Sequence, residues 1–176
     1  MAGDMTNQRV VNEDGQITIR RAVEQDFEAI WAILREAIER GDTFAYDPAT
    51  TKEEGRTIWM ETPVATYLAE VDGVVAGSYM LRKNQPGRGS HVANAGYMVS
   101  RAHRGRGIGR AMCEHSLREA RAMGFRSMQF NLVVSTNQHA VRLWESCGFR
   151  VLCELPEAFL HPEKGYVAAL LMHRNL

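Results

Sequence analysis

Cysteine is scarce in this sequence of 176 residues, and recognisable metal-binding patterns are lacking. The three cysteines, Cys113, Cys147 and Cys153, form no Cys-x-x-Cys pair, so neither a disulfide framework nor a zinc site is indicated. The six histidines show no His-Glu-x-x-His spacing, and we expect no bound metal. A Gly-x-Ser-x-Gly motif is also missing, which removes the nucleophile of a typical serine hydrolase.

Net charge and long apolar runs are lacking as well. The 21 basic and 21 acidic residues give a formal net charge of zero, so no general field attracts nucleic acid or an anionic membrane. No apolar run approaches the roughly 20 residues that a membrane-spanning helix needs, and residues 1–16 are polar without a signal-peptide core. We therefore expect a cytoplasmic protein whose partners include neither nucleic acid nor membrane.

The composition, with 45% hydrophobic and 24% charged residues, is typical of a globular chain long enough to bury a core. We predict a flexible N-terminal tail over residues 1–15 and a single domain over residues 16–176. In the first half of that domain, apolar periodicity predicts a strand over 16–20, helices over 24–40 and 51–61, and a hairpin with strands 64–70 and 74–81.

The second half of the sequence predicts alternating strands and helices around a glycine-rich turn. A strand over 91–99 leads into the turn, and a helix over 107–123 follows it. The remaining predicted elements are a strand over 127–135, a helix over 137–146, a strand over 148–155, a loop over 156–165 and a last strand over 166–173. This order indicates an α/β fold with a mixed sheet.

The most informative segment is His103–Arg110, which reads His-Arg-Gly-Arg-Gly-Ile-Gly-Arg. Gly105, Gly107 and Gly109 allow the main chain to turn tightly and to approach a ligand closely, because no Cβ stands in the way. The N–H groups of such a turn, and of the helix start behind it, point at one place that favours an anion. Positive charge around that place comes from the arginines of the segment, Arg104, Arg106 and Arg110. We expect a phosphate or pyrophosphate site.

Spacing distinguishes between the classes of phosphate-binding loop. A P-loop needs Lys and then Ser or Thr after its last glycine, whereas Arg110 and Ala111 follow here. The dinucleotide fingerprint needs two residues between its second and third glycines, but Ile108 alone separates Gly107 from Gly109. Both classes are therefore disfavoured.

The pattern Arg104-x-x-Gly107-x-Gly109 resembles the pyrophosphate-binding motif of the GNAT superfamily of N-acetyltransferases, whose loop and helix hold acetyl-CoA. The segment from Asn137 to Phe149 resembles the second motif of that family, in which an Asn opens a helix and an aromatic residue precedes a Gly-Phe pair. The resemblance implies a GNAT fold: a mixed, mostly antiparallel sheet of about seven strands, a splay between two central parallel strands, and about four helices. It also implies acetyl-CoA as the acetyl donor, no metal, and a homodimer, since dimers are frequent in the family.

The resemblance also implies which residues contact acetyl-CoA. In the family the pantetheine arm bonds to the backbone of the strand that enters the loop, which by position is Tyr97, Met98 and Val99. The pyrophosphate would lie against the loop and the helix start, Arg104, Gly105, Arg106, Gly107, Ile108, Gly109 and Arg110. Asn137 and Trp144 would lie further along the arm, although an Asn at this place also suits a helix N-cap.

Two asparagines lie inside predicted strands, where this residue type is disfavoured. Buried carboxamides must find partners, so Asn94 and Asn131 indicate a polar pocket at the splay; a solvent-facing or edge position is the alternative. The residues around them, 94–97 and 130–133 with Trp144, resemble the yeast N-acetyltransferases that detoxify azetidine-2-carboxylate, a proline analogue. We therefore place Asn94 and Asn131, with Tyr97, in the candidate catalytic set.

Acetyl transfer requires a deprotonated amine, a polarised thioester carbonyl and a fate for the departing thiolate. The N–H near Val99 is the expected oxyanion donor. Many family members protonate the thiolate with a Tyr of the second motif, but here that position is Trp144, whose indole is no acid at neutral pH. Either Tyr97 or water replaces it, or the thiolate leaves as an anion. Candidate bases are Glu36, Glu70, His91 and His161, with a water relay from the asparagines as the alternative.

Together these features favour an enzyme that moves an acetyl group from acetyl-CoA to the amine of a small molecule, an amino acid or an analogue, by direct attack in a ternary complex. A non-catalytic acyl-CoA-binding module is one alternative, because the family's Tyr is missing. A protein or peptide N-acetyltransferase is another, although the neutral composition gives no sign of a charged groove for a macromolecular acceptor.

Overall fold

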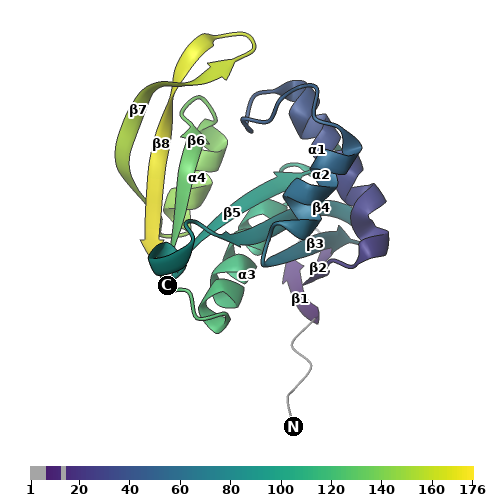
Figure 1. The fold of residues 1–176 in the computed structure, drawn as a ribbon. Helices are drawn as coiled ribbons and strands as arrows, with labels where there is room; N and C mark the ends of the chain where they lie inside the picture. Colours follow the sequence, from purple (N-terminus) through teal and green to yellow (C-terminus); the bar gives the residue numbers. More distant parts are fainter. Residues whose placement is uncertain (1–6, 13–14) are drawn as a thin grey trace.

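The computed structural model describes residues 7–12 and 15–176, which form one eight-stranded sheet with helices on both faces (Figure 1). The strands are β1 (Asn7–Asn12), β2 (Gly15–Arg21), β3 (Ala65–Val71), β4 (Val74–Lys83), β5 (Val92–Val99), β6 (Ser127–Val134), β7 (Arg150–His161) and β8 (Gly165–Asn175). The helices are α1 (Phe27–Arg40), α2 (Lys52–Arg56), α3 (Ile108–Ala122) and α4 (Gln138–Ser146).

The sheet order is β1-β2-β3-β4-β5-β6-β8-β7, and β5 and β6 are the parallel pair among antiparallel neighbours. The α/β class and the mixed, mostly antiparallel sheet are confirmed. The sheet has one strand more than the expected seven or so. The flexible tail expected over residues 1–15 lies partly outside the described residues, and within it Asn7–Asn12 forms β1, which pairs with β2.

Helix α1 follows the predicted pattern closely, and α2 does so only in part. A 3-10 turn over Glu24–Asp26 leads into α1, and Gly41 ends α1 in the left-handed conformation with a φ of 61°. Thr51 caps α2 through a capping box with Glu54. Helix α2 then continues into a π-helical turn over Thr57–Glu61, so the expected single helix over 51–61 is two short pieces.

The loop predicted over residues 156–165 is wrong, because β7 continues through Pro156 to His161. Proline lacks the N–H that a central strand needs, and this absence suggested a loop. Strand β7, however, lies at the edge of the sheet, where the missing N–H of a proline need not cost a ladder bond. The register shift between Leu155 and Phe159 and the positive φ of Glu157, 51°, show where the strand accommodates the proline.

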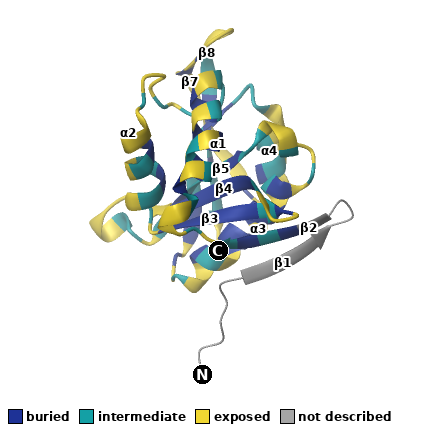
Figure 2. Ribbon diagram, turned by 90° about the vertical axis from the view of Figure 1, so that its right-hand side faces the viewer, coloured by how far each residue is buried: buried dark blue, intermediate teal, exposed yellow. Residues whose placement is uncertain are grey.

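Alternating strand residues divide the core between the two sheet faces. Leu68, Met80 and Met98 pack with α1 and with Trp59, while Tyr67 and Tyr79 on the opposite face pack with α3. Helices α1 and α2 cover one face and α3 the other (Figure 1), and most of β3 and the middle of β4, residues 76–81, are buried between them (Figure 2). Within the described part of the chain, no helix is long and apolar enough to span a membrane.

Candidate acetyl-donor and acceptor site

The two parallel strands separate soon after they pair. Strands β5 and β6 are in register at Val92 with Ser127 and at Ala93 with Met128, and nowhere beyond. Strand β6 instead continues along β8, with an irregularity between Phe130 and Val133. The last six residues of β5 therefore face a gap rather than a neighbouring strand.

Backbone alternation determines which groups of β5 point into this gap. The carbonyl of Val92 accepts a bond from Asn84 N on the β4 side (2.8 Å), and the carbonyl of His91 accepts one from Arg126 N on the β6 side (2.9 Å). By alternation, the N–H and C=O groups of Ala95, Tyr97 and Val99 face the gap. Those of Met98 face β4, which corrects the expectation that the Met98 backbone would bond to a cofactor.

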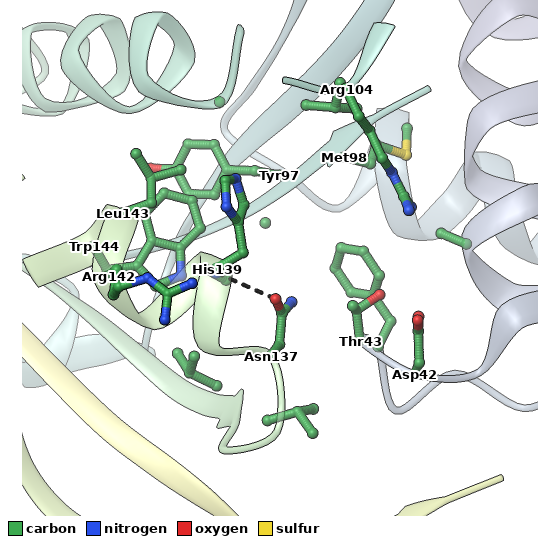
Figure 3. Close-up of a pocket in the computed structure, with 18 of the residues that line it drawn as sticks. Asp42, Thr43, Tyr97, Met98, Arg104, Asn137, His139, Arg142, Leu143 and Trp144 are labelled. Atoms are coloured by element: carbon green, nitrogen blue, oxygen red, sulfur yellow. Dashed lines mark hydrogen bonds between the residues drawn. The ribbon is translucent and has the colours of Figure 1, made fainter. Parts of the chain in front are cut away.

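A cavity of about 990 Å³ follows the gap from the glycine-rich turn to the loop between α1 and α2. Its lining carries an excess of cations, Arg40, Arg104, Arg110, Arg142 and Lys164, against one acidic residue, Asp42. Figure 3 shows Arg104 on one wall and Asn137, His139 and Arg142 on the other. A protein of zero formal charge thus concentrates positive potential in one concave place, which favours an anionic ligand.

The glycine-rich turn has the conformation that its sequence predicts. Gly105 and Gly107 have φ values of 78° and 75°, which a residue with a Cβ rarely adopts. Gly107 is the N-cap of α3 and supplies no side-chain cap, so the first N–H groups of α3 keep no partner from a capping side chain. Gly107, Ile108 and Gly109 all line the cavity. The helix start is therefore suited to an anion.

Residues 24–149 match the acetyltransferase (GNAT) family. The chain belongs to this family. The N-acetyltransferase aca1 of Schizosaccharomyces pombe is 34% identical over 151 residues, which cover 76% of this chain and 72% of aca1. A GCN5-related N-acetyltransferase from Kribbella flavida is 48% identical with a TM-score of 0.87, covering 91% of this chain and 98% of that structure.

A third similar protein was solved together with acetyl-CoA. The putative acetyltransferase yncA of Salmonella typhimurium was solved with its cofactor acetyl-CoA; it is 25% identical, with a TM-score of 0.78, over 91% of this chain and 94% of that chain. These matches confirm the GNAT family, its fold and the acyltransferase class of this enzyme. Among the described residues, no group of three or more His, Cys, Asp or Glu side chains could hold a metal.

Most of the predicted cofactor residues of this GNAT enzyme line the cavity. Met98, Val99, Arg104, Gly105, Arg110 and Trp144 do so, as do the residues of the helix start. Arg106 does not belong to the lining, in contrast to the expectation. Arg110 donates to Ser146 Oγ (2.9 Å), and a Cβ at Gly109 would come within 3.0 Å of Leu143 Cδ2, so this glycine allows α3 to approach α4.

Asn137 occupies the N-terminus of α4, where its Oδ1 accepts a bond from the N–H of Ala140 at 3.2 Å. This is the N-cap role that the residue type favours. Asn137 also lines the cavity, and its carboxamide points into it (Figure 3). Both interpretations of Asn137 made from the sequence therefore remain compatible with its position.

Tyr97 lines the cavity with its ring and turns its hydroxyl away. The hydroxyl lies 2.6 Å from Ser116 Oγ, and Ser116 in turn donates to the carbonyl of Cys113. Ser116 Oγ therefore accepts the hydrogen bond that the Tyr97 hydroxyl donates, and this hydroxyl points toward α3. Burial holds the pKa of Tyr97 well above its usual value. This geometry disfavours Tyr97 as the general acid; its ring instead supports Trp144 at a centroid distance of 4.7 Å.

Asn94 and Asn131 are brought together through a residue that sequence reasoning missed. The carbonyl of the Asn84 side chain accepts bonds from Asn94 Nδ2 (3.1 Å) and from Asn131 Nδ2 (2.7 Å). Asn94 is buried and Asn131 is exposed. Asn84 precedes Gln85-Pro86-Gly87 and reads as an ordinary turn residue, so no signal in the sequence could have revealed its role.

Of the four candidate bases, His161 alone lines the cavity. Glu70 forms an ion pair with Arg20 at 2.8 Å, and Glu36 pairs with Arg40 at 3.3 Å. His161 Nδ1 accepts a bond from the N–H of Glu163 (3.1 Å), which places the proton of the neutral ring on Nε2. His161 is thus better arranged to donate a hydrogen bond than to accept a proton.

Two further lining features escaped prediction. His139 and Arg142, on α4, also line the cavity, and nothing in the sequence analysis marked them as site residues. Thr43 lies at the other end of the cavity, and its Oγ1 is buried without a hydrogen-bond partner among the described residues. A buried hydroxyl without a partner is unfavourable unless a ligand or water satisfies it.

Proposed function

We propose that the enzyme binds acetyl-CoA along the gap between β5 and β6 and transfers its acetyl group to the amine of a small molecule, an amino acid or an analogue. The observation that supports this proposal is the meeting of three features in one cavity. These are the strand backbone that faces the gap at Tyr97 and Val99, the N-terminus of α3 without a side-chain cap, and the excess of cationic side chains.

The residues present fit acetyl-CoA. The turn at Gly105–Gly107 and the start of α3 suit the pyrophosphate, with Arg104 and Arg110 nearby. The backbone of Tyr97 and Val99 can bond to the amide groups of the pantetheine arm in the manner of an added strand. Asn137 would contact the arm from the opposite wall.

Direct attack in a ternary complex needs no covalent enzyme intermediate. The amine forms the new C–N bond at the thioester carbonyl, the C–S bond breaks, and the amine loses a proton to water or a base. The Val99 N–H, which faces the gap, would stabilise the negative charge on the carbonyl oxygen. Because Trp144 carries no acidic proton and the Tyr97 proton faces Ser116, the thiolate would leave as an anion or take its proton from water.

The acceptor side would lie where Asn94 and Asn131 meet through Asn84, because these carboxamides border the splay on the side away from α3. Ordered water held by the amides would accept the amine proton. We also propose one domain over residues 16–176 and a homodimer in a cytoplasmic setting.

A substitution that introduces a negative charge at the glycine turn tests the proposal. Gly107→Glu places a carboxylate against the pyrophosphate position, and we expect calorimetric acetyl-CoA affinity to fall by about 100-fold or more. The matched control is Gly124→Glu, since Gly124 also has a positive φ, 84°, and lies at the other end of α3. Both variants should lose about 1 kcal/mol of stability from backbone strain.

The result that would overturn the cofactor site is an unchanged affinity in Gly107→Glu, or an equal loss in both variants. Release of free thiol from acetyl-CoA, measured with amino acids, amines and short peptides as acceptors, separates the functions. Release that depends on a small amine supports the proposal. Tight acetyl-CoA binding without turnover supports the binding module, and turnover limited to peptides supports a protein acceptor.

A further inference from the structure

A second, smaller cavity of about 190 Å³ adjoins the large one on the sheet face that α1 and α2 cover. Its wall comes from the loop after α1 and from β4, β5 and β6. The residues that line both cavities are Thr43, Phe44, Ala95, Gly96, Phe130 and Leu132. The volume lies below the roughly 300–1,000 Å³ of pockets for drug-sized ligands, so a compact ligand fits.

The charge of this smaller cavity comes from one residue, Arg82. The ion pairs between arginine and carboxylate side chains in residues 7–12 and 15–176 involve Arg20, Arg35, Arg40, Arg56 and Arg110 and do not involve Arg82. The side chain of Tyr46 lies near it and provides no negative charge at neutral pH, because burial raises the pKa of its phenol. A cation in a concave wall without an acidic neighbour favours an anionic group of a ligand.

The side-chain carbonyl of Asn94, an uncharged hydrogen-bond acceptor, belongs to the residue directly opposite Arg82 on the neighbouring strand. Arg82 and Asn94 are opposite each other in β4 and β5, so their side chains share one sheet face. Asn94 donates its Nδ2 to Asn84, which leaves its Oδ1 for another donor. Directly opposite residues have Cβ atoms about 5 Å apart, and the carboxylate and amine of an α-amino acid are separated by a single carbon.

We propose that the smaller cavity binds the acceptor, with Arg82 receiving a carboxylate that the acceptor carries beside its amine. The substrate class is therefore free amino acids, linear or cyclic, rather than simple amines or internal peptide residues. Asn94 Oδ1 accepts a hydrogen bond from the amine, and the shared wall at Ala95 and Gly96 places that amine beside the backbone that faces the gap. This inference rests on the proposed acetyl transfer.

Matched acceptors with and without the carboxylate test the inference. The probes are the common L-amino acids and azetidine-2-carboxylate, each paired with the amine that lacks only the carboxylate, in the thiol-release assay. We expect kcat/KM of the wild type to favour the carboxylate member of the best pair by at least about tenfold. Arg82→Met should lower kcat/KM for that member about 30-fold, mostly through KM, and change it less than about threefold for its decarboxylated partner.

The matched control is Lys83→Met. Lys83 is the next residue, is also exposed, lines neither cavity and points to the opposite face of β4, so its loss should leave both rates unchanged. Arg82→Lys, which keeps the charge without the fork, should recover part of the preference. Calorimetry should show wild-type acetyl-CoA affinity in all three variants.

The outcomes separate the two proposals. A wild type that does not bind acetyl-CoA, or that turns over no acceptor at all, contradicts the proposed acetyl transfer and this inference with it. A wild type that acetylates amines or peptides without preferring the carboxylate, or an Arg82→Met variant that retains the preference, overturns the carboxylate site and leaves acetyl transfer in place.

Discussion

His115 is a histidine that burial keeps neutral. It lies on α3 with 2% of its surface exposed, and its Nδ1 lies 2.5 Å from the Tyr79 hydroxyl. Burial lowers its pKa from 6.5 to about 4, with the charge of Arg118 lowering it further and that of Glu119 opposing the shift. Between these two pH values, His115 is therefore protonated in the unfolded chain and neutral in the folded protein.

Because the unfolded state binds this proton more readily, the free energy of unfolding decreases as pH falls through 6.5 toward about 4. Between pH 7 and pH 5, His115 should reduce the free energy of unfolding by about 2 kcal/mol, and urea titration at the two pH values measures this. His115→Gln should be less stable than the wild type at pH 7 but should lose less between pH 7 and pH 5. The control is His91→Asn, at an exposed histidine, whose free energy of unfolding should depend on pH as in the wild type. If His115→Gln also keeps the wild-type pH dependence, His115 is not the group that causes it.

At the residue scale, the sequence predicted local features of the site and missed distant ones. Gly105 and Gly107 could be predicted because a tight turn before a helix is a property of neighbouring residues. The bonds of Asn84 could not, since they join residues 10 and 47 positions apart. The direction of the Tyr97 hydroxyl depends on Ser116 of another element, which periodicity in β5 does not reveal.

At the scale of the element, substitutions at the start of α4 test whether Asn137 is only a helix N-cap or also contacts acetyl-CoA. As N-cap, Asn137 satisfies the Ala140 N–H, and Ala at this position should cost about 1 kcal/mol of stability. Ser caps as well as Asn but has no carboxamide to reach a pantetheine arm. We therefore expect Asn137→Ser to retain the stability of the wild type, while acetyl-CoA affinity falls several-fold in both variants.

Urea unfolding and calorimetry on the same two variants separate these effects. If Asn137→Ser binds acetyl-CoA as the wild type does, Asn137 is a cap alone. A matched control is Thr51→Ala, which removes the capping box of α2 away from the cavity. It should lower stability without changing acetyl-CoA affinity.

The elements themselves could be predicted where their sequence pattern is local. Helices α1, α3 and α4 begin and end within a few residues of their expected positions, because apolar spacing and terminal glycines mark them. The second half of β7 could not be predicted, because a proline is compatible with a strand only at a sheet edge or a bulge. Whether a strand lies at the edge depends on the order of all strands in the sheet, which a local pattern does not reveal.

At the scale of the whole molecule, the hairpin of β7 and β8 concentrates exposed apolar surface. The large apolar side chains exposed on it are Val151, Leu152, Leu155, Leu160 and Tyr166, five of the eight in the described chain. Figure 1 shows the hairpin at one end of the sheet with β7 outermost, and β7 has no neighbouring strand on its outer side among the described residues. Such a strand is prone to association, so this surface is where the proposed homodimer would form, with two copies related by a twofold axis.

Sedimentation velocity tests this assembly. We expect the wild type to be a dimer at micromolar concentration, and the double variant Leu152→Glu/Leu160→Glu to be a monomer, because each dimer would then bury four unpaired carboxylates. Val74→Glu is the matched control: Val74 is 56% exposed, comparable to 58% for Leu152 and 63% for Leu160, but belongs to β4. It should remain dimeric. A monomeric wild type, or a double variant that stays dimeric, would rule out this interface. If the double variant is monomeric and retains acetyl-CoA affinity, each copy holds a complete cofactor site.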